Sequence, residues 1–150
     1  MTTLAIKDGV MAADSRVTGD SFFFGTQKIQ RLSAKSLAGI VGDAVIALTI
    51  VQWLRSKRVP SELHKLIPPD GREDACVVEL TPTGIFIWNG HGVPLAVSGP
   101  IYACGSGAQA AMAAMILGDT AEAAVKLAIR LDEGSGPPVQ VESLKPTRKR

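Results

Sequence analysis

The sequence predicts an α+β domain in which two sheets are covered by helices. Two observations lead to this fold class. Short strand-like segments and longer helix-like segments both occur, and their order along the chain is strands, helix, strands, two helices, strand. At 150 residues the chain has the length of one ordinary domain with a real core. Apolar residues make up 46% and charged residues 20% of it, which is typical of globular proteins rather than disordered ones.

The first half of the chain alternates short strands with turns and then forms one long helix. Asp8-Gly9 is a preferred hairpin dipeptide and separates the first two apolar segments. Asp43 is expected to cap the helix AVIALTIVQWLRSKR, whose basic end suits the helix dipole and which Val59-Pro60 stops. The predicted strands of this half are Thr3 to Lys7, Val10 to Ala13, a strand beginning in Phe22 to Gly25, Lys28 to Leu32, and Ser36 to Val41.

The second half begins with a short helix at most, over Ser61 to Leu66, and then the loop PPDGRED. GSGAQAAMAAMILG is an Ala-rich helix able to approach its neighbour closely. Asp119 and Glu122 have capping-box spacing for a second helix that has one apolar face. The predicted strands of this half are Cys76 to Leu80, Ile85 to Trp88, Ile101 to Cys104, and Val139 to Leu144.

Charge and composition exclude several classes of protein. The net charge is +2, and the basic residues are scattered apart from the tail KPTRKR, so no nucleic-acid partner is expected. Cys76 and Cys104 make no disulfide scaffold and are expected to pack as small hydrophobes. No signal peptide and no apolar run of membrane-spanning length occurs, so we expect no membrane partner and a cytoplasmic protein.

Several motifs in order along the chain resemble the proteasome β-subunit and the bacterial HslV-type peptidase, which are N-terminal-nucleophile hydrolases. Each motif alone is weak, but together they cover nearly the whole chain. The resemblance implies a four-layer αββα sandwich and a single peptidase domain over residues 1–144, followed by a basic tail over residues 145–150. The motifs are Thr2-Thr3, Ala13-Asp14-Ser15-Arg16, Gln27-Lys28-Ile29, Ala38-Gly39-Ile40-Val41-Gly42-Asp43, Gly105-Ser106-Gly107 and Asp132-x-x-Ser135-Gly136.

The resemblance implies that Met1 is removed and that Thr2 becomes the nucleophile. A threonine hydroxyl is a weak nucleophile and needs a base beside it. A free α-amine titrates near about 8, so part of it accepts a proton at physiological pH. Lys28 is expected to favour deprotonated hydroxyl and amine through its charge, and Asp14 to hold the Lys28 ammonium in place.

The resemblance implies roles for further residues around Thr2 and Lys28. The Gly39 N–H is expected to stabilise the oxyanion. Ser106, Asp132 and Ser135 are expected to form a hydrogen-bonded shell around the Thr2 amine, and Arg16 is expected to be a supporting residue of the site. The implied substrate pocket consists of Thr26, Leu37 and Val41. No cofactor is required, but backbone carbonyls of Ile129, Asp132 and Ser135 are expected to hold a structural sodium, magnesium or calcium ion.

Simpler structural interpretations apply to each motif by itself. Asp14 and Arg16 fit an exposed turn, Lys28 fits a solvated strand face, and GSG before a helix fits a cap at Ser106. The ordered coincidence of the motifs favours the peptidase. The segment from Pro60 to Asp74 departs from the family, because the relatives carry a full second helix there. The chain also ends soon after its last strand, so the resemblance implies a shortened member of the family.

Three classes of function remain open at the level of the sequence. The first is a threonine endopeptidase acting on unfolded polypeptide in a homo-oligomeric ring fed by a separate ATPase unfoldase. The second is a small-molecule amidase of the same superfamily, which needs a polar pocket that the residues do not indicate. The third is a catalytically silent homologue, against which the retention of Thr2, Asp14, Lys28 and Ser106 argues.

Overall fold

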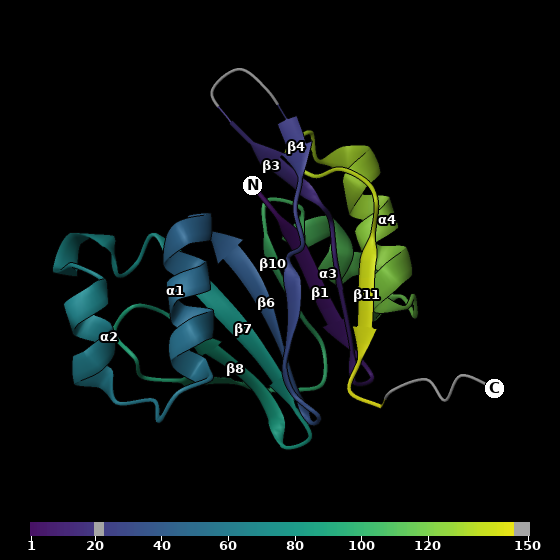
Figure 1. Cartoon of the computed structure of the whole chain (residues 1–150). Helices are drawn as coiled ribbons and strands as arrows, with labels where there is room; N and C mark the ends of the chain where they lie inside the picture. The colour runs from purple at the N-terminus through teal and green to yellow at the C-terminus, as the bar shows by residue number, and fades with distance from the viewer. Residues whose placement is uncertain (20–22, 146–150) are drawn as a thin grey trace.

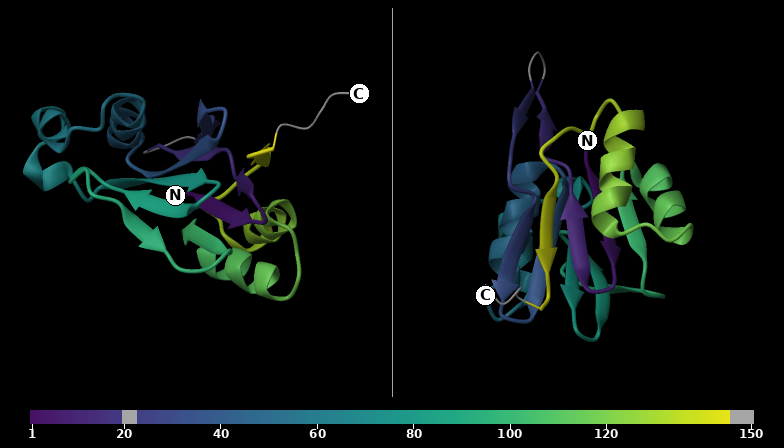
Figure 2. Two further views of the ribbon diagram at one scale, coloured as in Figure 1. Left: turned by 90° about the horizontal axis from the view of Figure 1, so that it is seen from below. Right: turned by 90° about the vertical axis from the view of Figure 1, so that its right-hand side faces the viewer.

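The computed structural model describes residues 1–19 and 23–145, with only the backbone of Phe23 and Phe24. Two antiparallel sheets lie face to face, and two helices cover the outer face of each (Figure 1). Figure 2, on the left, shows these layers from below, with one pair of helices at the top and the other at the bottom. The predicted α+β class and the αββα layering are confirmed.

The first sheet has four strands in the order β10-β1-β2-β11, all antiparallel. Asp8 and Gly9 both have positive φ, 53° and 73°, which is the two-residue turn that matches the twist of a hairpin. The strands are β1 (Thr3–Lys7), β2 (Val10–Ala13), β10 (Tyr102–Gly105) and β11 (Gln140–Ser143).

The second sheet has five antiparallel strands in chain order. A separate two-stranded ribbon extends beyond the layers at the end where the chain begins (Figure 1). The strands of the sheet are β5 (Ile29–Ser33), β6 (Ser36–Gly42), β7 (Ala75–Thr81), β8 (Gly84–Trp88) and β9 (Leu95–Val97), and those of the ribbon are β3 (Arg16–Thr18) and β4 (Phe23–Gly25).

The helices α1 (Ala44–Leu54) and α2 (Pro60–Leu66) lie on the side of the five-stranded sheet, and a 3-10 turn (Pro69–Gly71) follows them. The helices α3 (Ala108–Ile116) and α4 (Ala121–Leu131) cover the four-stranded sheet. Asp43 caps α1 as predicted, since its Oδ1 accepts the N–H groups of Val45 and Ile46 at 2.9 Å.

Side-chain alternation along β1 divides the core into layers. Leu4 and Ile6 point between the two sheets, where they meet residues such as Leu37 and Val78. Ala5 points the other way, into a cluster of alanines from α3 and α4, so these helices pack closely on the sheet. A third cluster under α1 and α2 contains both tryptophans, which make an edge contact with ring centroids 5.6 Å apart.

Four features differ from the sequence prediction. The helix α1 ends at Leu54 instead of Arg58, because the Ser56 hydroxyl and the Arg58 guanidinium donate hydrogen bonds to the carbonyls of Trp53 and Leu54.

The other three differences concern helix caps and short strands. Thr120, rather than Asp119, caps α4. Gly107, rather than Ser106, is the N-cap residue of α3. The strands β3 and β9 were not predicted, and Phe22 lies outside the described residues.

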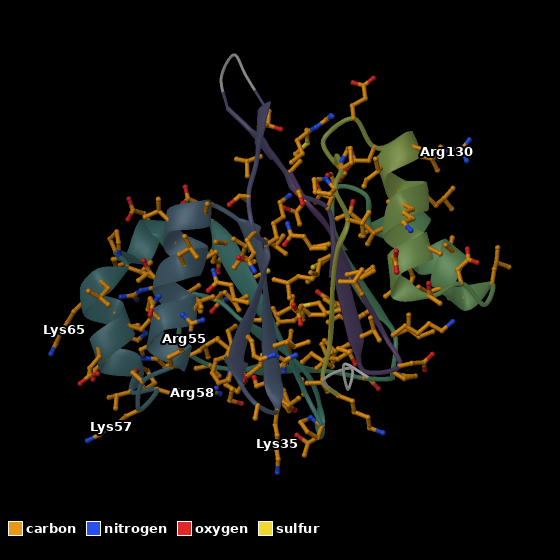
Figure 3. The ribbon with its side chains drawn as sticks, turned by 45° about the vertical axis from the view of Figure 1, so that its right-hand side comes forward. Lys35, Arg55, Lys57, Arg58, Lys65 and Arg130 are labelled. Atoms are coloured by element: carbon orange, nitrogen blue, oxygen red, sulfur yellow. The ribbon has the colours of Figure 1, made fainter. Side chains whose placement is uncertain are left out.

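Basic side chains project from opposite sides of the molecule. Figure 3 shows Lys35 at the turn between β5 and β6, Arg55 and Arg58 near the end of α1, Lys65 on α2, and Arg130 on α4. Among the helices in the described part of the chain, none is long and apolar enough to cross a membrane.

Candidate active site

The start of β1 holds the first residues of the chain in a fixed place. Thr2 is 5% exposed and Thr3 is fully buried, whereas Met1 is 64% exposed. Thr3 pairs with Gly105 on β10, and its carbonyl oxygen accepts the Asp14 N–H at 3.1 Å. The position of Thr2 is therefore set by the middle of a sheet, unlike that of a frayed terminus.

The Asp14 carboxylate lies fully buried just after β2. Its Oδ1 accepts the Thr3 N–H at 2.9 Å and the Lys28 ammonium at 2.8 Å. Its Oδ2 accepts the N–H groups of Arg16 and Gly136, both at 3.0 Å. All four groups around it are donors, which suits an ionised carboxylate, because that form only accepts. The interpretation of Asp14 and Arg16 as an exposed turn is wrong for Asp14.

The Lys28 ammonium lies between Asp14 and the first peptide group of the chain. Besides Asp14 it donates to the Met1 carbonyl at 3.1 Å, and that carbonyl is bonded to the Thr2 nitrogen. Lys28 is 2% exposed, so it is no solvated strand residue. Burial lowers the pKa of Lys28 from its ordinary value, and the negative charges of Asp14 and Asp132 only partly offset this effect.

The Asp132 carboxylate collects the hydroxyls of the two predicted serines. Ser106 and Ser135 both donate to its Oδ2 at 2.6 Å, and Ser106 also approaches the Thr2 carbonyl at 3.4 Å. Burial raises the pKa of Asp132, but the hydrogen bonds from Ser106, Ser135 and the Gly134 N–H outweigh it and hold that pKa below its ordinary value. The structure thus brings this predicted trio together beside Thr2.

Thr3 connects the hydrogen bonds around Asp14 with those around Asp132, and the sequence analysis gave Thr3 no role. Its N–H binds Asp14, and its hydroxyl lies 2.7 Å from Ser135 Oγ. Because the single hydroxyl proton of Ser135 points to Asp132, Thr3 is the donor to Ser135. Thr3 and Ser135 lie 132 residues apart, so no spacing in the sequence signals this role.

A cleft of about 260 Å³ opens at Thr2 and Lys28. Its walls come from the start of the chain, the β3–β4 ribbon with the residues after it, and the junction of β6 with α1. The cleft is lined by Met1, Thr2, Val17, Thr18, Thr26, Lys28, Ile40, Gly42, Asp43 and Ala44.

Two of the three predicted pocket residues lie elsewhere. Thr26 lines the cleft, but Leu37 is fully buried and Val41 packs against the same core between the sheets. Side chains alternate along β6, so residues 37 and 41 face the four-stranded sheet. Gly39 shares that face, where an added Cβ would come within 2.6 Å of Leu4 Cδ1, so close packing of β6 on β1 itself requires glycine.

Arg16 and the loop after α4 frame the other side of the site. The Arg16 guanidinium packs against Gly136 and donates to the Glu133 carbonyl at 2.9 Å. Ile129 is inside α4 and Asp132 follows its last turn, where the Asp132 carbonyl accepts the Ser135 N–H at 3.1 Å. Carbonyl oxygens at a helix end are of the kind that hard cations prefer. No cluster of three or more His, Cys, Asp or Glu side chains with metal-binding geometry occurs among the described residues.

Comparison with solved structures identifies the fold. The chain is similar to eukaryotic HslV from Trypanosoma brucei, with 19% identity, a TM-score of 0.67, and coverage of 95% of this chain and 98% of that one. It is also similar to BPH of Thiobacillus denitrificans, with 22% identity, a TM-score of 0.71, and coverage of 98% and 100%.

The same BPH in complex with epoxomicin gives 24% identity, a TM-score of 0.69, and coverage of 97% and 100%. No family model and no curated protein matches the sequence. The chain therefore has the HslV and proteasome type of fold over almost its whole length.

Proposed function

We propose that this chain is a threonine endopeptidase whose nucleophile is Thr2, exposed as the first residue when Met1 is removed. The observation that carries the proposal is the hydrogen bond from Lys28 Nζ to the Met1 carbonyl. The buried Lys28 ammonium lies beside the peptide bond whose nitrogen becomes the Thr2 α-amine when Met1 is removed. Thr2 lines a cleft at this point. A serine or threonine hydroxyl in the middle of a strand lacks such a base.

The proposed reaction uses the two functional groups of one residue. The neutral α-amine accepts the Thr2 hydroxyl proton as Oγ1 attacks the scissile carbonyl, and a tetrahedral oxyanion forms. The amine returns the proton to the leaving nitrogen, the C–N bond breaks, and water later hydrolyses the ester on Thr2. The Lys28 charge favours the neutral amine and the developing alkoxide, while Asp14 holds Lys28 in place.

The other site residues keep the roles that the resemblance implies. Gly39 precedes Ile40 of the cleft wall, and its N–H remains the proposed oxyanion donor. Ser106, Ser135 and Asp132 are proposed to orient the amine, because their hydrogen-bonded cluster reaches the Thr2 carbonyl through Ser106. An ion at the carbonyls of Ile129, Asp132 and Ser135 would stiffen the loop that carries this cluster.

We propose unfolded polypeptide as the substrate and a closed homo-oligomeric ring as the working form, fed by a separate ATPase unfoldase. Support for the ring comes from apolar side chains that the monomer leaves exposed. On α1 these are Val45 and Leu48, and at the end of α3 they are Ile116 and Leu117, exposed by 69% and 87%. A ring also keeps a free threonine nucleophile away from other proteins of the proposed cytoplasmic location.

Hydrolysis of a fluorogenic peptide tests the proposal. We expect the mature chain to cleave it, Thr2→Ser to keep part of the rate, and Thr2→Ala to lose about a thousandfold or more with an unchanged circular dichroism spectrum. Cleavage of small amides but not of peptides would favour an amidase. Full activity of Thr2→Ala would exclude Thr2 as the nucleophile.

A further inference from the structure

We infer that Gln140 is a positioning residue that fixes the main chain at Lys28, so that the Lys28 ammonium stays beside Thr2. The inference rests on the proposed function, because it assigns Gln140 an effect on the reaction at Thr2. Gln140 belongs to none of the motifs that carry the family resemblance, and it does not line the Thr2 cleft.

The Gln140 amide uses its full hydrogen-bonding capacity on Ser15 and on the chain from Thr26 to Ile29, at the start of β5. Its Oε1 accepts the N–H groups of Lys28 at 2.7 Å and Ile29 at 3.2 Å. Its Nε2 donates to the Thr26 carbonyl at 2.6 Å and to Ser15 Oγ at 2.7 Å. Two acceptor and two donor positions are all that a primary amide offers.

The place of Gln140 in the fold explains why a side chain makes these contacts. Its backbone is on β11, the edge of the four-stranded sheet, whereas Lys28 precedes β5, the edge of the five-stranded sheet. The right-hand view of Figure 2 shows yellow β11 between the blue strands and the purple ones. The two sheets are not joined by strand pairing at this point, so the amide stands in for a neighbouring strand.

The consecutive residues Asp14 and Ser15 therefore fix the two ends of Lys28, its ammonium group and its main chain. Asp14 binds the ammonium at 2.8 Å. Ser15, which is 3% exposed and donates to the Pro138 carbonyl at 2.6 Å, anchors the amide that binds the Lys28 N–H. A side chain with four rotatable bonds is held in one position only when its base and its tip are both fixed.

A matched control lies at the other end of the contact between β5 and β11. Arg31 on β5 donates to the Ser143 carbonyl at 2.6 Å and pairs with Glu142 at 3.3 Å, both on β11. Arg31→Met therefore loosens the contact between β5 and β11 without touching the Lys28 main chain. A general loss of packing between these strands would affect both variants alike.

The experiment compares mature wild type, Gln140→Leu and Arg31→Met, each verified by mass to begin at Thr2. We expect Gln140→Leu to lower kcat for a fluorogenic peptide by about tenfold to a hundredfold, as a small misplacement of a charge near the reacting atoms does. KM should change by less than kcat, because Thr26 of the cleft wall loses only one hydrogen bond to its carbonyl. Arg31→Met should keep wild-type kcat. If Gln140→Leu does not fold, Gln140→Glu keeps the acceptor for the Lys28 N–H and removes the donors to Thr26 and Ser15.

A second readout does not depend on catalysis. The charged groups facing Lys28 are Asp14 and Asp132. The Lys28 charge should lower the pKa of the Thr2 α-amine relative to a solvated α-amine, while the two carboxylates act in the opposite direction. In Gln140→Leu that pKa, followed by pH-dependent acylation of the amine, should rise relative to the wild type, and in Arg31→Met it should not move.

These readouts separate the inference from the proposed function. Unchanged kcat and unchanged amine pKa in Gln140→Leu would overturn the role of Gln140, as would equal losses in Arg31→Met. A wild type that hydrolyses no peptide, but whose amine pKa responds to Gln140→Leu alone, would refute the peptidase and leave the positioning role standing.

Discussion

Lys28 Nζ lies 2.8 Å from Asp14 Oδ1, and solvent reaches 3% of the lysine side chain and none of the aspartate side chain. Removing one partner of such a pair leaves an uncompensated buried charge. We expect Lys28→Met to lower the free energy of unfolding by about 3–5 kcal/mol. The double variant Asp14→Asn with Lys28→Met should lose less than the two single variants together, as urea unfolding would measure. Additive losses would contradict the direct coupling of the two charges.

Activity at high pH should depend on the Lys28 charge. Burial lowers the pKa of Lys28, so as pH rises the ammonium is lost before a solvated lysine would lose its proton, and kcat/KM should fall with it. Arginine stays charged over the same range. Lys28→Arg should be slower at every pH because its planar fork does not fit, but its kcat/KM should not fall on the alkaline side. A parallel fall in both proteins would assign the alkaline limb to another group.

The two serines on Asp132 should differ in their effect on stability. Ser135 is 2% exposed and accepts from the buried Thr3 hydroxyl, so Ser135→Ala leaves that donor unpaired. We expect a loss of about 1–3 kcal/mol in the free energy of unfolding. Ser106 is exposed, and Ser106→Ala should lose less than about 0.5 kcal/mol while still slowing hydrolysis. Equal destabilisation by both variants would show that the Thr3 hydroxyl finds another partner.

Local chemistry made most of the fold predictable. The dipeptide Asp8-Gly9 and the cap at Asp43 set the β1–β2 hairpin and the start of α1 where the sequence placed them. The end of α1 was missed, because the Ser56 and Arg58 side chains that close it resemble further helical residues. The strand β9 was missed because three residues beside Pro94 carry little periodicity, and its pairing with β8 supplies the order.

The candidate site was predictable where a motif is local and not where contacts are distant. Asp14 and Lys28 were named from short motifs, and they meet across 14 residues of chain. Thr3 reaches Ser135 across 132 residues, and Gln140 reaches Lys28 across 112, so no spacing in the sequence signals either contact. Leu37 and Val41, which the resemblance assigned to the pocket, lie on the face of β6 that packs against the core between the sheets.

Assembly should depend on the apolar end of α3. We expect light scattering to give a closed ring at micromolar concentration, of about six or seven subunits as the family resemblance implies. Ile116→Lys combined with Leu117→Lys should reduce the assembled mass and leave the fold intact, because both side chains are exposed in the monomer. Lys126→Ala, an exposed change on α4, is the control. A wild type that remains monomeric would exclude the ring.

The central claim is that Thr2 carries both the nucleophilic hydroxyl and the free amine. BPH of Thiobacillus denitrificans forms a complex with epoxomicin. The two electrophilic carbons of an epoxyketone of this kind can bond to a hydroxyl and an amine of one residue. The direct measurement is the mass of the mature protein after treatment with epoxomicin, with peptide mapping of the adduct. The account predicts one adduct on Thr2, absent from Thr2→Ala and from the chain that retains Met1. An unmodified mature protein, or an adduct on any other residue, would contradict it.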